Sequence, residues 1–340
     1  MNVAINGFGR IGRLFFRQAF SDPSMTIVAI NDLGDVDNLA YLLKYDTVYG
    51  RWDKEVKADV ARNMMIIDGK EIPVVKEKEM TKLPWAKFNV DVAVESTGLF
   101  ESFEKVRGHI TAGAKRVVIT APAKDEDGPD QKTILNGIND AQFKMCTISS
   151  NGSCTTNSVS PVVSILAENP GIEKAMLTTI HAYTATQRIV DGPDGKDWRR
   201  GRAGAQNSVP STTGAAIAVT RVVESLKGKF DGIAVRVPVP AGSLSDITFL
   251  TKRPVTASEI NDILRKASEE PRWKGILKVT DEQLVSSDIV GQPFGAIVDT
   301  SFTKVVDGNF VKVLSWYDNE WGYVSMLLRH VRSAGLAGTV

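Results

Sequence analysis

The chain has 340 residues, of which 43% are hydrophobic and 24% are charged. This length exceeds the size at which one hydrophobic core usually stops growing, about 250–300 residues, so we expect two domains and exclude a disordered chain. The 41 lysines and arginines balance 40 aspartates and glutamates. A net charge of +1 gives no whole-molecule field for binding nucleic acid or an acidic membrane, and neither partner is expected.

The chain shows no sign of a membrane span or of secretion. No window approaches roughly 18–20 uninterrupted apolar residues, and the first residues are typical of a strand and a glycine turn rather than a signal peptide. The two cysteines, Cys146 and Cys154, are too few for a disulfide framework and suit a reducing compartment. We therefore expect a soluble, cytoplasmic protein. No metal is expected, because no cluster of His, Cys and Asp has ligand spacing.

The first half of the chain predicts a mostly parallel sheet. Residues 3–6 form an apolar run that ends in glycines, and apolar residues then recur every four positions from Ile11, as on one face of a helix. A second apolar run at 26–31 completes a strand-helix-strand unit with a right-handed crossover. The Asp-Gly pair within 63–75 predicts an antiparallel hairpin. Further buried strands are predicted over 90–97, 115–120 and 146–150.

Three glycines, Gly7, Gly9 and Gly12, fit the GxGxxG pattern of a dinucleotide site. Glycines permit a tight turn and a close approach of pyrophosphate to backbone N–H groups at a helix N-terminus. Asp32 stands about 20 residues further on, at the end of the next strand, where a carboxylate can accept both ribose hydroxyls. Such a carboxylate repels a 2′-phosphate and favours NAD over NADP. The alternatives are a glycine turn that serves packing only and an Asp32 that caps its loop.

After Cys154 the predicted elements change. A helix-length stretch extends to Asn169, but Pro161 predicts a kink or a later start of this helix. The remaining sequence is mainly long strand-like runs, with a hairpin predicted at Asp307–Gly308. Residues 188–204 have no usable period and predict a long ordered loop, and residues 321–331 predict a helix.

Cys154 lies between small hydroxyl residues at the predicted start of a helix. A helix N-terminus and a nearby histidine stabilise a thiolate and lower the thiol pKa from about 8.5 towards 7 or less. A thiolate is the nucleophile for covalent catalysis at a carbonyl. The segment alone fits a buried structural cysteine equally well.

His181 is the candidate base among the three histidines. It ends an apolar run at a predicted strand end, where a side chain projects into a cleft, whereas His109 and His330 fit surface or packing positions. Arg236 lies in a strongly apolar strand and needs an acidic residue or a bound anion as its partner. The arginines of 199–202 also suit an anion, and nucleic acid is disfavoured there because aromatic residues are not interleaved.

Six segments carry a resemblance to a known family: INGFGRIGR, SNGSCTTN, HAYTATQ, DWRRGRAGAQNSVPSTTGAA, IAVRVPVP and WYDNEWGY. With these segments in this order, the chain closely resembles phosphorylating glyceraldehyde-3-phosphate dehydrogenase from end to end. The resemblance implies an α/β architecture: a Rossmann-type, mostly parallel NAD domain over 1–153 and an α+β catalytic domain over 154–319 with a mainly antiparallel sheet. It also implies a terminal helix over 320–340 that returns to the first domain, and a homotetramer in which the long loop lines an interface.

The resemblance also implies roles for individual residues. Cys154 is the nucleophile and His181 the general base. The expected NAD contacts are Gly7, Gly9, Arg10, Ile11, Gly12, Asp32, Thr97, Thr120, Asn319 and Tyr323. The expected contacts to substrate phosphate and inorganic phosphate are Thr184 and Arg236 on one side and Ser153, Thr155, Arg200, Thr213 and Gly214 on the other.

The implied reaction converts glyceraldehyde 3-phosphate, NAD and inorganic phosphate to 1,3-bisphosphoglycerate in glycolysis or gluconeogenesis. A sulfur nucleophile suits this reaction, because the thioester at Cys154 has little resonance stabilisation and so keeps acyl-transfer energy for attack by phosphate. An oxygen ester keeps less of this energy. The nearest alternative is erythrose-4-phosphate dehydrogenase, disfavoured by HAYT and STTG. The alternative that is not an enzyme is a nucleotide- or RNA-binding protein that uses the same fold without turnover.

The sequence departs from the family pattern in several places. Thr186 stands where the family usually has Asp, which affects the phosphate site. Ser158 replaces a common second cysteine, so a disulfide with Cys154 is excluded. Gly192 replaces a leucine found in many NAD-specific members, which permits some use of NADP. Gly152 and Ala241 replace a usual Ala and Asn.

Overall fold

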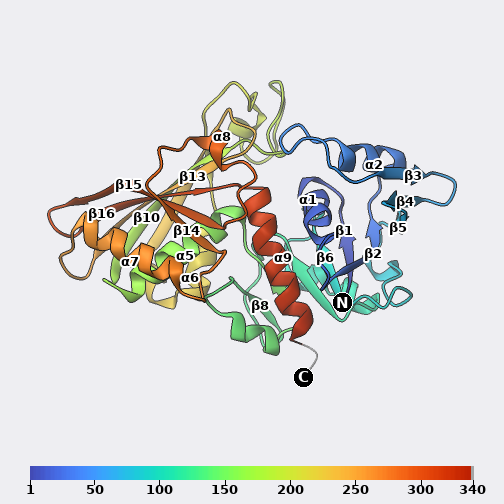
Figure 1. Cartoon of the computed structure of the whole chain (residues 1–340), viewed down its shortest axis with the longest axis horizontal. Helices are drawn as coiled ribbons and strands as arrows, with labels where there is room; N and C mark the ends of the chain where they lie inside the picture. Colours follow the sequence, from blue (N-terminus) through green and yellow to red (C-terminus); the bar gives the residue numbers. More distant parts are fainter. Residues whose placement is uncertain (338–340) are drawn as a thin grey trace. The chain divides into compact units, whose positions relative to one another are not determined.

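The computed structural model describes residues 1–337 and divides the chain into two compact units (Figure 1). Met1–Gly152 form the first unit together with the described residues from Leu327 onward, and Ser153–Met326 form the second. The predicted terminal helix is α9, which spans Trp321–Leu336. Its predicted end at 338–340 lies outside the described residues.

The first unit contains a nine-stranded sheet. The strands are β1 (Asn2–Asn6), β2 (Thr26–Asn31), β3 (Val56–Asp59), β4 (Met64–Ile67), β5 (Lys70–Val75), β6 (Val92–Glu95), β7 (Arg116–Ile119), β8 (Gln131–Thr133) and β9 (Ile148–Ser150). Their order is β3-β4-β5-β2-β1-β6-β7-β9-β8, antiparallel from β3 to β5 and parallel beyond. The chain reverses direction across the sheet between β1 and β6, the switch point where doubly wound sheets bind nucleotides.

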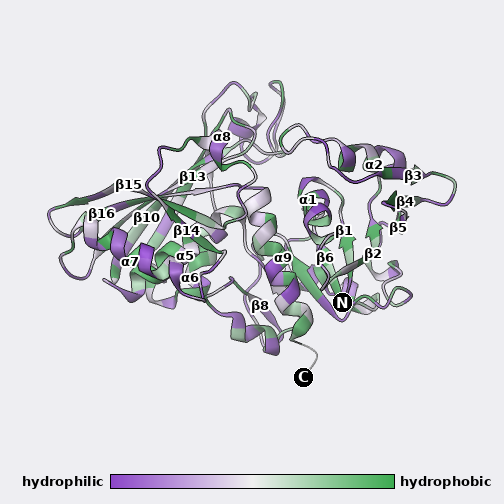
Figure 2. Cartoon of the chain, viewed as in Figure 1, coloured by the Kyte–Doolittle hydropathy of each residue, from purple (hydrophilic) through white to green (hydrophobic). Residues whose placement is uncertain are grey.

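The helices of the first unit connect these strands. They are α1 (Arg10–Ala19), α2 (Val36–Lys44), α3 (Phe103–Val106) and α4 (Gly108–Thr111), with 3₁₀ turns η1 (Met80–Lys82) and η2 (Asp140–Met145). Val3, Ile5, Val92 and Val94 are fully buried, and Figure 2 shows β1, β2 and β6 as hydrophobic. Parallel strands need such runs because both of their faces are covered. The predicted hairpin is confirmed between β4 and β5.

The second unit contains a seven-stranded mixed sheet. The strands are β10 (Ile172–Ala182), β11 (Val209–Thr212), β12 (Phe230–Val237), β13 (Ser243–Thr251), β14 (Leu277–Thr280), β15 (Ala296–Val306) and β16 (Phe310–Tyr317). They lie in the order β11-β12-β10-β13-β16-β15-β14. Within this sheet of the described chain, only β10–β12 and β14–β15 are parallel pairs, so the expected mainly antiparallel sheet is confirmed. The predicted hairpin at Asp307–Gly308 joins β15 to β16.

Helix α5 (Cys154–Glu168) contacts strands β10, β13, β15 and β16. The other helices of this unit are α6 (Ala215–Val222), α7 (Ala257–Glu269) and α8 (Ser286–Ile289), with 3₁₀ turns η3 (Trp198–Gly201) and η4 (Glu224–Leu226). Helix α5 begins at Cys154 although it contains Pro161, so the later start expected from this proline is wrong.

The predicted long loop over 188–204 contains the short turn η3 and an isolated parallel bridge between Arg188 and Ala203. His109 and His330, expected at surface or packing positions, are both fully buried. In residues 1–337, no helix has the length and apolar character needed to cross a membrane.

Candidate active site

The crevice of the first unit opens beside the glycine turn. It has a volume of about 500 Å³ and is lined by residues from the ends of several strands, among them Gly7, Gly9, Asp32 and Thr97. Gly7 has a φ of +93°, and a Cβ built there would lie 2.5 Å from the backbone nitrogen of Thr97. A Cβ on Gly9 would meet no atom within 4 Å, so this glycine leaves open space at the start of α1. The turn therefore fits a pyrophosphate held by the helix N-terminus.

Asp32 has a structural role in addition to its predicted one. Its Oδ2 accepts a hydrogen bond from the backbone nitrogen of Phe8 at 2.7 Å, and its Oδ1 accepts one from that of Gly34 at 2.8 Å. Asp32 thus caps its own loop, as the alternative interpretation of the sequence predicts. Each carboxylate oxygen keeps a further lone pair for a ribose hydroxyl.

The other residues of the first unit that are predicted to contact the nucleotide lie at the start of α1 and after β7. Arg10, Ile11 and Gly12 form the first turn of α1, and the Arg10 side chain pairs with Asp46 at 2.6 Å. Thr120 follows β7, and its hydroxyl donates to the backbone oxygen of Glu95 at 3.0 Å.

Asn319 and Tyr323 belong to the second unit, where both are buried. Asn319 Oδ1 accepts hydrogen bonds from the Gly242 nitrogen at 3.1 Å and from Ser243 Oγ at 3.0 Å. These two donors fix the orientation of the Asn319 amide. Ser243 Oγ also accepts from the Ala182 nitrogen at 3.1 Å and so connects Asn319 to the strand end beside His181.

Within the second unit, Cys154, His181 and Arg236 form one cluster. Ser153 precedes α5 and its Oγ accepts from the Thr156 nitrogen at 3.0 Å, which places Cys154 in the first helical turn. His181 and Arg236 are paired neighbours at the ends of β10 and β12. Cys154 Sγ lies 3.3 Å from His181 Nε2, and Arg236 Nη1 lies 2.5 Å from His181 Nδ1.

The hydrogen bonds of His181 allow two tautomers. Nδ1 lies 2.7 Å from the Ala182 oxygen, to which it can only donate, and next to Arg236 Nη1, from which it can only accept. When Nδ1 donates to Ala182, Nε2 accepts the proton of the Cys154 thiol. When Nδ1 accepts from Arg236, Nε2 carries a proton and donates to a thiolate. The ring can therefore serve both charge states of the sulfur.

Burial dominates the ionisation of this pair. It raises the pKa of the Cys154 thiol above its ordinary value, although the positive charge of Arg236 opposes the shift. Burial, together with Arg236, lowers the pKa of His181 to about 3. The favoured resting state is a neutral thiol beside a neutral imidazole. This direction is opposite to the lowered thiol pKa expected from the sequence, because burial outweighs the opposing effects of Arg236 and of the Thr155 and Cys154 hydrogen bonds.

Tyr317 belongs to the cluster but was missed by sequence reasoning. Its hydroxyl lies 2.9 Å from Thr155 Oγ1 and 2.8 Å from Thr179 Oγ1, and its ring packs edge-on against His181 with centroids 5.9 Å apart. Residues i and i+2 of a strand share a face. The alternation along β10 therefore predicts Thr179 beside His181, but no local pattern indicates Tyr317.

Among the predicted phosphate residues, Arg200 lies close enough to Arg236 to affect its pKa. Arg200 donates to Ser211 Oγ through Nε at 3.0 Å and Nη2 at 2.7 Å, and within residues 1–337 neither Arg200 nor Arg236 pairs with a carboxylate. Burial lowers the pKa of Arg236, and the nearby charge of Arg200 adds to this shift. Two neighbouring guanidinium groups without an acidic partner favour an anion.

The other predicted phosphate residues include hydroxyl side chains with local hydrogen bonds. Thr184 Oγ1 and Thr186 Oγ1 are 2.9 Å apart, so the residue that replaces the family's usual Asp contacts Thr184 directly. Thr213 Oγ1 accepts from the Ala215 nitrogen at 3.2 Å, and Gly214 precedes helix α6. Ser158, in place of a second cysteine, lies 3.3 Å from Ser315 Oγ in the core.

A crevice that fits a dinucleotide in one unit and a thiol–imidazole–guanidinium cluster in the other are both typical of a dehydrogenase with a cysteine nucleophile. Residues 1–103 match the family model described as glyceraldehyde 3-phosphate dehydrogenase, NAD binding domain, and residues 153–319 match that of the C-terminal domain. The chain belongs to the glyceraldehyde-3-phosphate dehydrogenase family, as the sequence predicts, and NAD is its cofactor.

Curated relatives named glyceraldehyde-3-phosphate dehydrogenase match nearly the full length. The Streptomyces coelicolor protein is 48% identical over 96% of this chain and 96% of its own length. The Borreliella burgdorferi protein is 49% identical over 95% of this chain and 96% of its own length. The Geobacillus stearothermophilus protein is 47% identical over 99% of both chains.

Proposed function

We propose that this chain oxidises glyceraldehyde 3-phosphate with NAD and inorganic phosphate to 1,3-bisphosphoglycerate, and that Cys154 carries the acyl group. The observation that carries the proposal is the 3.3 Å contact between Cys154 Sγ and His181 Nε2. A thiol that hands its proton to a neighbouring imidazole becomes a nucleophile for a carbonyl carbon.

Cys154 and His181 account for the covalent attachment of the substrate and for the proton transfers. Cys154 Sγ attacks the aldehyde carbon while His181 Nε2 takes the thiol proton and passes it to the carbonyl oxygen. His181 then removes the proton from this hydroxyl, which drives formation of the thioester. Bound NAD supplies the acceptor for the hydride lost from this carbon. A phosphate oxygen finally attacks the thioester carbon, and the departing sulfur recovers its proton from His181.

Two sets of residues are assigned to anions under this proposal. Thr184 and Arg236 form one set. The other contains Ser153, Thr155, Arg200, Thr213 and Gly214. The absence of carboxylate partners for Arg200 and Arg236 within residues 1–337 supports the assignment, because a bound phosphate supplies the missing negative charge. The proposed NAD residues are Gly7, Gly9, Arg10, Ile11, Gly12, Asp32, Thr97, Thr120, Asn319 and Tyr323.

The experiment that tests the function is a burst measurement. Enzyme, NAD and glyceraldehyde 3-phosphate are mixed without phosphate, and NADH is followed by its absorbance. We expect about one NADH per active site, followed by continuous turnover when phosphate is added. Turnover at full rate without phosphate would contradict acyl transfer to phosphate. A higher kcat/KM for erythrose 4-phosphate would assign the chain to that substrate instead.

Replacing Asp32 with alanine tests the cofactor assignment. The substitution removes the negative charge that repels a 2′-phosphate and leaves the Phe8 and Gly34 nitrogens without their acceptor. We expect weaker use of NAD and a shift of the NAD/NADP preference towards NADP by roughly 1–3 kcal/mol. The measurement compares kcat/KM for both cofactors, with Asp37→Ala, which removes an exposed carboxylate of α2, as control. An unchanged ratio in Asp32→Ala would remove Asp32 from cofactor selection.

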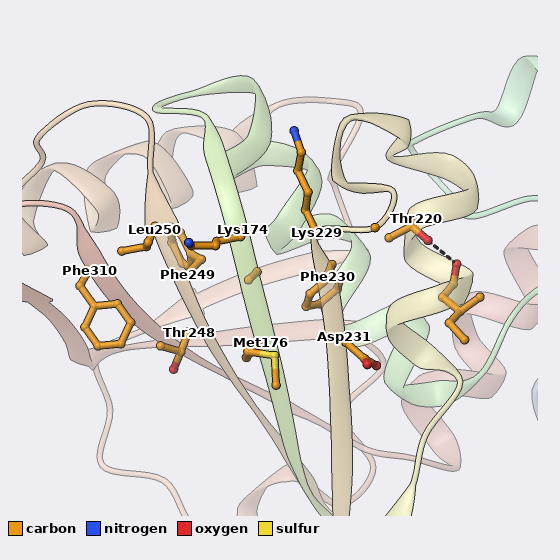
Figure 3. Close-up of a pocket in the computed structure, with 13 residues that line it drawn as sticks. Lys174, Met176, Thr220, Lys229, Phe230, Asp231, Thr248, Phe249, Leu250 and Phe310 are labelled. Atoms are coloured by element: carbon orange, nitrogen blue, oxygen red, sulfur yellow. Dashed lines mark hydrogen bonds between the residues drawn. The ribbon is translucent and has the colours of Figure 1, made fainter.

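The proposed oligomer is a homotetramer, and an open sheet face supports self-association (Figure 3). A shallow pocket of about 730 Å³ lies over strands β10, β12, β13 and β16. Met176, Ile217 and Phe310 around it are 59%, 60% and 47% exposed. Lys174 and Asp231 also line the pocket, and their opposite charges can form ion pairs between two copies of the chain related by a two-fold axis. Light scattering is expected to give the mass of four chains, and a monomer would contradict the proposal.

We assign residues 1–153 and the terminal helix to the NAD domain and 154–319 to catalysis. The two compact units support this division, except that Ser153 and residues 320–326 group with the second unit. A cytoplasmic location is proposed because Cys146 and Cys154 are both free thiols, which suits a reducing compartment. Cell fractionation tests this, and recovery outside the cytoplasm would contradict it.

A further inference from the structure

A fully buried carboxylate lies beneath the crevice of the first unit. Glu95 ends strand β6 and is 1% exposed. Its Oε2 accepts from Asn6 Nδ2 at 2.6 Å and lies 3.0 Å from His109 Nε2, and its Oε1 accepts from the backbone nitrogen of Thr97 at 2.9 Å and from the Thr97 hydroxyl. A buried carboxylate needs such donors, and each of these is supplied by a side chain or backbone group of the same unit.

The hydrogen bonds of His109 fix its tautomer. The indole nitrogen of Trp85 lies 2.8 Å from His109 Nδ1, and an indole N–H can only donate. Nδ1 therefore accepts, and Nε2 carries the proton that is donated to Glu95. Both rings are fully buried, and their planes are within 22° of parallel, with centroids 6.1 Å apart. Neither side chain lines the crevice.

The partners of Glu95 face the crevice. Asn6 and Thr97 line it, and so does Asn31, whose Nδ2 donates to Asn6 Oδ1 at 2.7 Å. Asn31 is held in turn by both backbone groups of Glu77, at 2.9 Å each. A continuous chain of hydrogen bonds thus runs from Trp85 through His109 and Glu95 to the polar floor of the crevice.

We propose that Glu95 and His109 are positioning residues for NAD, which hold Thr97 and Asn6 in the orientation that the cofactor meets. This inference rests on the assignment of the crevice to NAD. Removing the proton that His109 donates leaves the carboxylate short of one donor, so Thr97 and Asn6 shift to compensate. Neither positioning residue belongs to the reacting cluster of Cys154 and His181. The effect therefore falls on the Kd and KM for NAD rather than on kcat at saturating NAD.

The test compares His109→Phe with His330→Phe. His330 is a matched control because it is also fully buried in the first unit with both ring nitrogens bonded, at 2.7 Å to Ser149 Oγ and 3.1 Å to Asn151 Oδ1. None of its partners lines the crevice. We expect both variants to lose stability, but only His109→Phe to raise the Kd for NAD, by roughly tenfold. His109→Gln, which can accept at one atom and donate at the other, should recover most of the affinity.

NAD affinity is measured by quenching of protein fluorescence, with the unfolding midpoint and kcat recorded on the same samples. Wild-type affinity in folded His109→Phe, or an equal loss in His330→Phe, would overturn the positioning role. If His109→Phe does not fold, Trp85→Phe, which removes the donor to Nδ1 and leaves a smaller apolar ring, must raise the Kd in the same direction. Failure of the wild-type protein to bind NAD would refute the proposed function itself, which separates the two outcomes.

Discussion

Replacing Cys154 with serine is expected to lower kcat/KM by about 10⁴-fold or more while NAD binding stays close to wild type. A serine hydroxyl is a far weaker nucleophile than a thiol at the same position. The oxygen ester that it would form also conserves less acyl-transfer energy for phosphate. The measurement pairs NADH formation with the Kd for NAD, so that loss of chemistry is separated from loss of folding.

The second cysteine offers the matched control. Cys146 is 4% exposed, and burial raises the pKa of its thiol to about 11, so this thiol is neutral and inert at neutral pH. Cys146→Ala should therefore keep most of the wild-type activity. If Cys154→Ser turned over NAD at a substantial fraction of the wild-type rate, Cys154 would not be the nucleophile.

Replacing His181 with asparagine is expected to lower kcat/KM by roughly 10²–10⁴-fold near neutral pH. Because the pKa of His181 is lowered to about 3, the wild-type imidazole is neutral at any working pH and can accept the thiol proton. Asparagine fills similar space but cannot accept this proton. The variant then depends on solvent to ionise a thiol whose pKa is raised by burial.

The direction of the pH dependence follows from these two shifts. As pH rises towards the thiol pKa, the thiolate fraction of His181→Asn increases, so its deficit relative to wild type should shrink. Rates are compared from about pH 6 to about pH 9, where the range is set by ordinary histidine and cysteine pKa values. A deficit of the same size at every pH would show that His181 positions the substrate without transferring a proton.

The general architecture can be predicted from the sequence because its signals are local. The apolar run of β1, the glycine turn and Asp32 lie within one strand-helix-strand unit, and both Asp-Gly hairpins appear where their turns require positive φ, as at Asp68 and Asp307. Helix α5 was harder to predict, because Pro161 argues locally against a helix that the surrounding buried packing nevertheless maintains.

Contacts between distant residues could not be predicted. Asn6 and Glu95 are 89 positions apart, and Thr155 and Tyr317 are 162 apart, so no periodic pattern brings them together. His109 was assigned only to a surface or packing position because its partners, Trp85 and Glu95, lie on separate segments. The upward shift of the Cys154 pKa has the same origin, since burial depends on the whole fold.

An acyl group carried by the sulfur of Cys154 is the central intermediate of the proposed reaction. The direct measurement is mass spectrometry of peptides from enzyme mixed with NAD and glyceraldehyde 3-phosphate in the absence of phosphate and quenched in acid. We predict a phosphoglyceroyl thioester on the peptide that contains Cys154, and its disappearance when phosphate is added before quenching. A full burst of NADH with that peptide unmodified, or with the acyl group on another residue, would contradict the account.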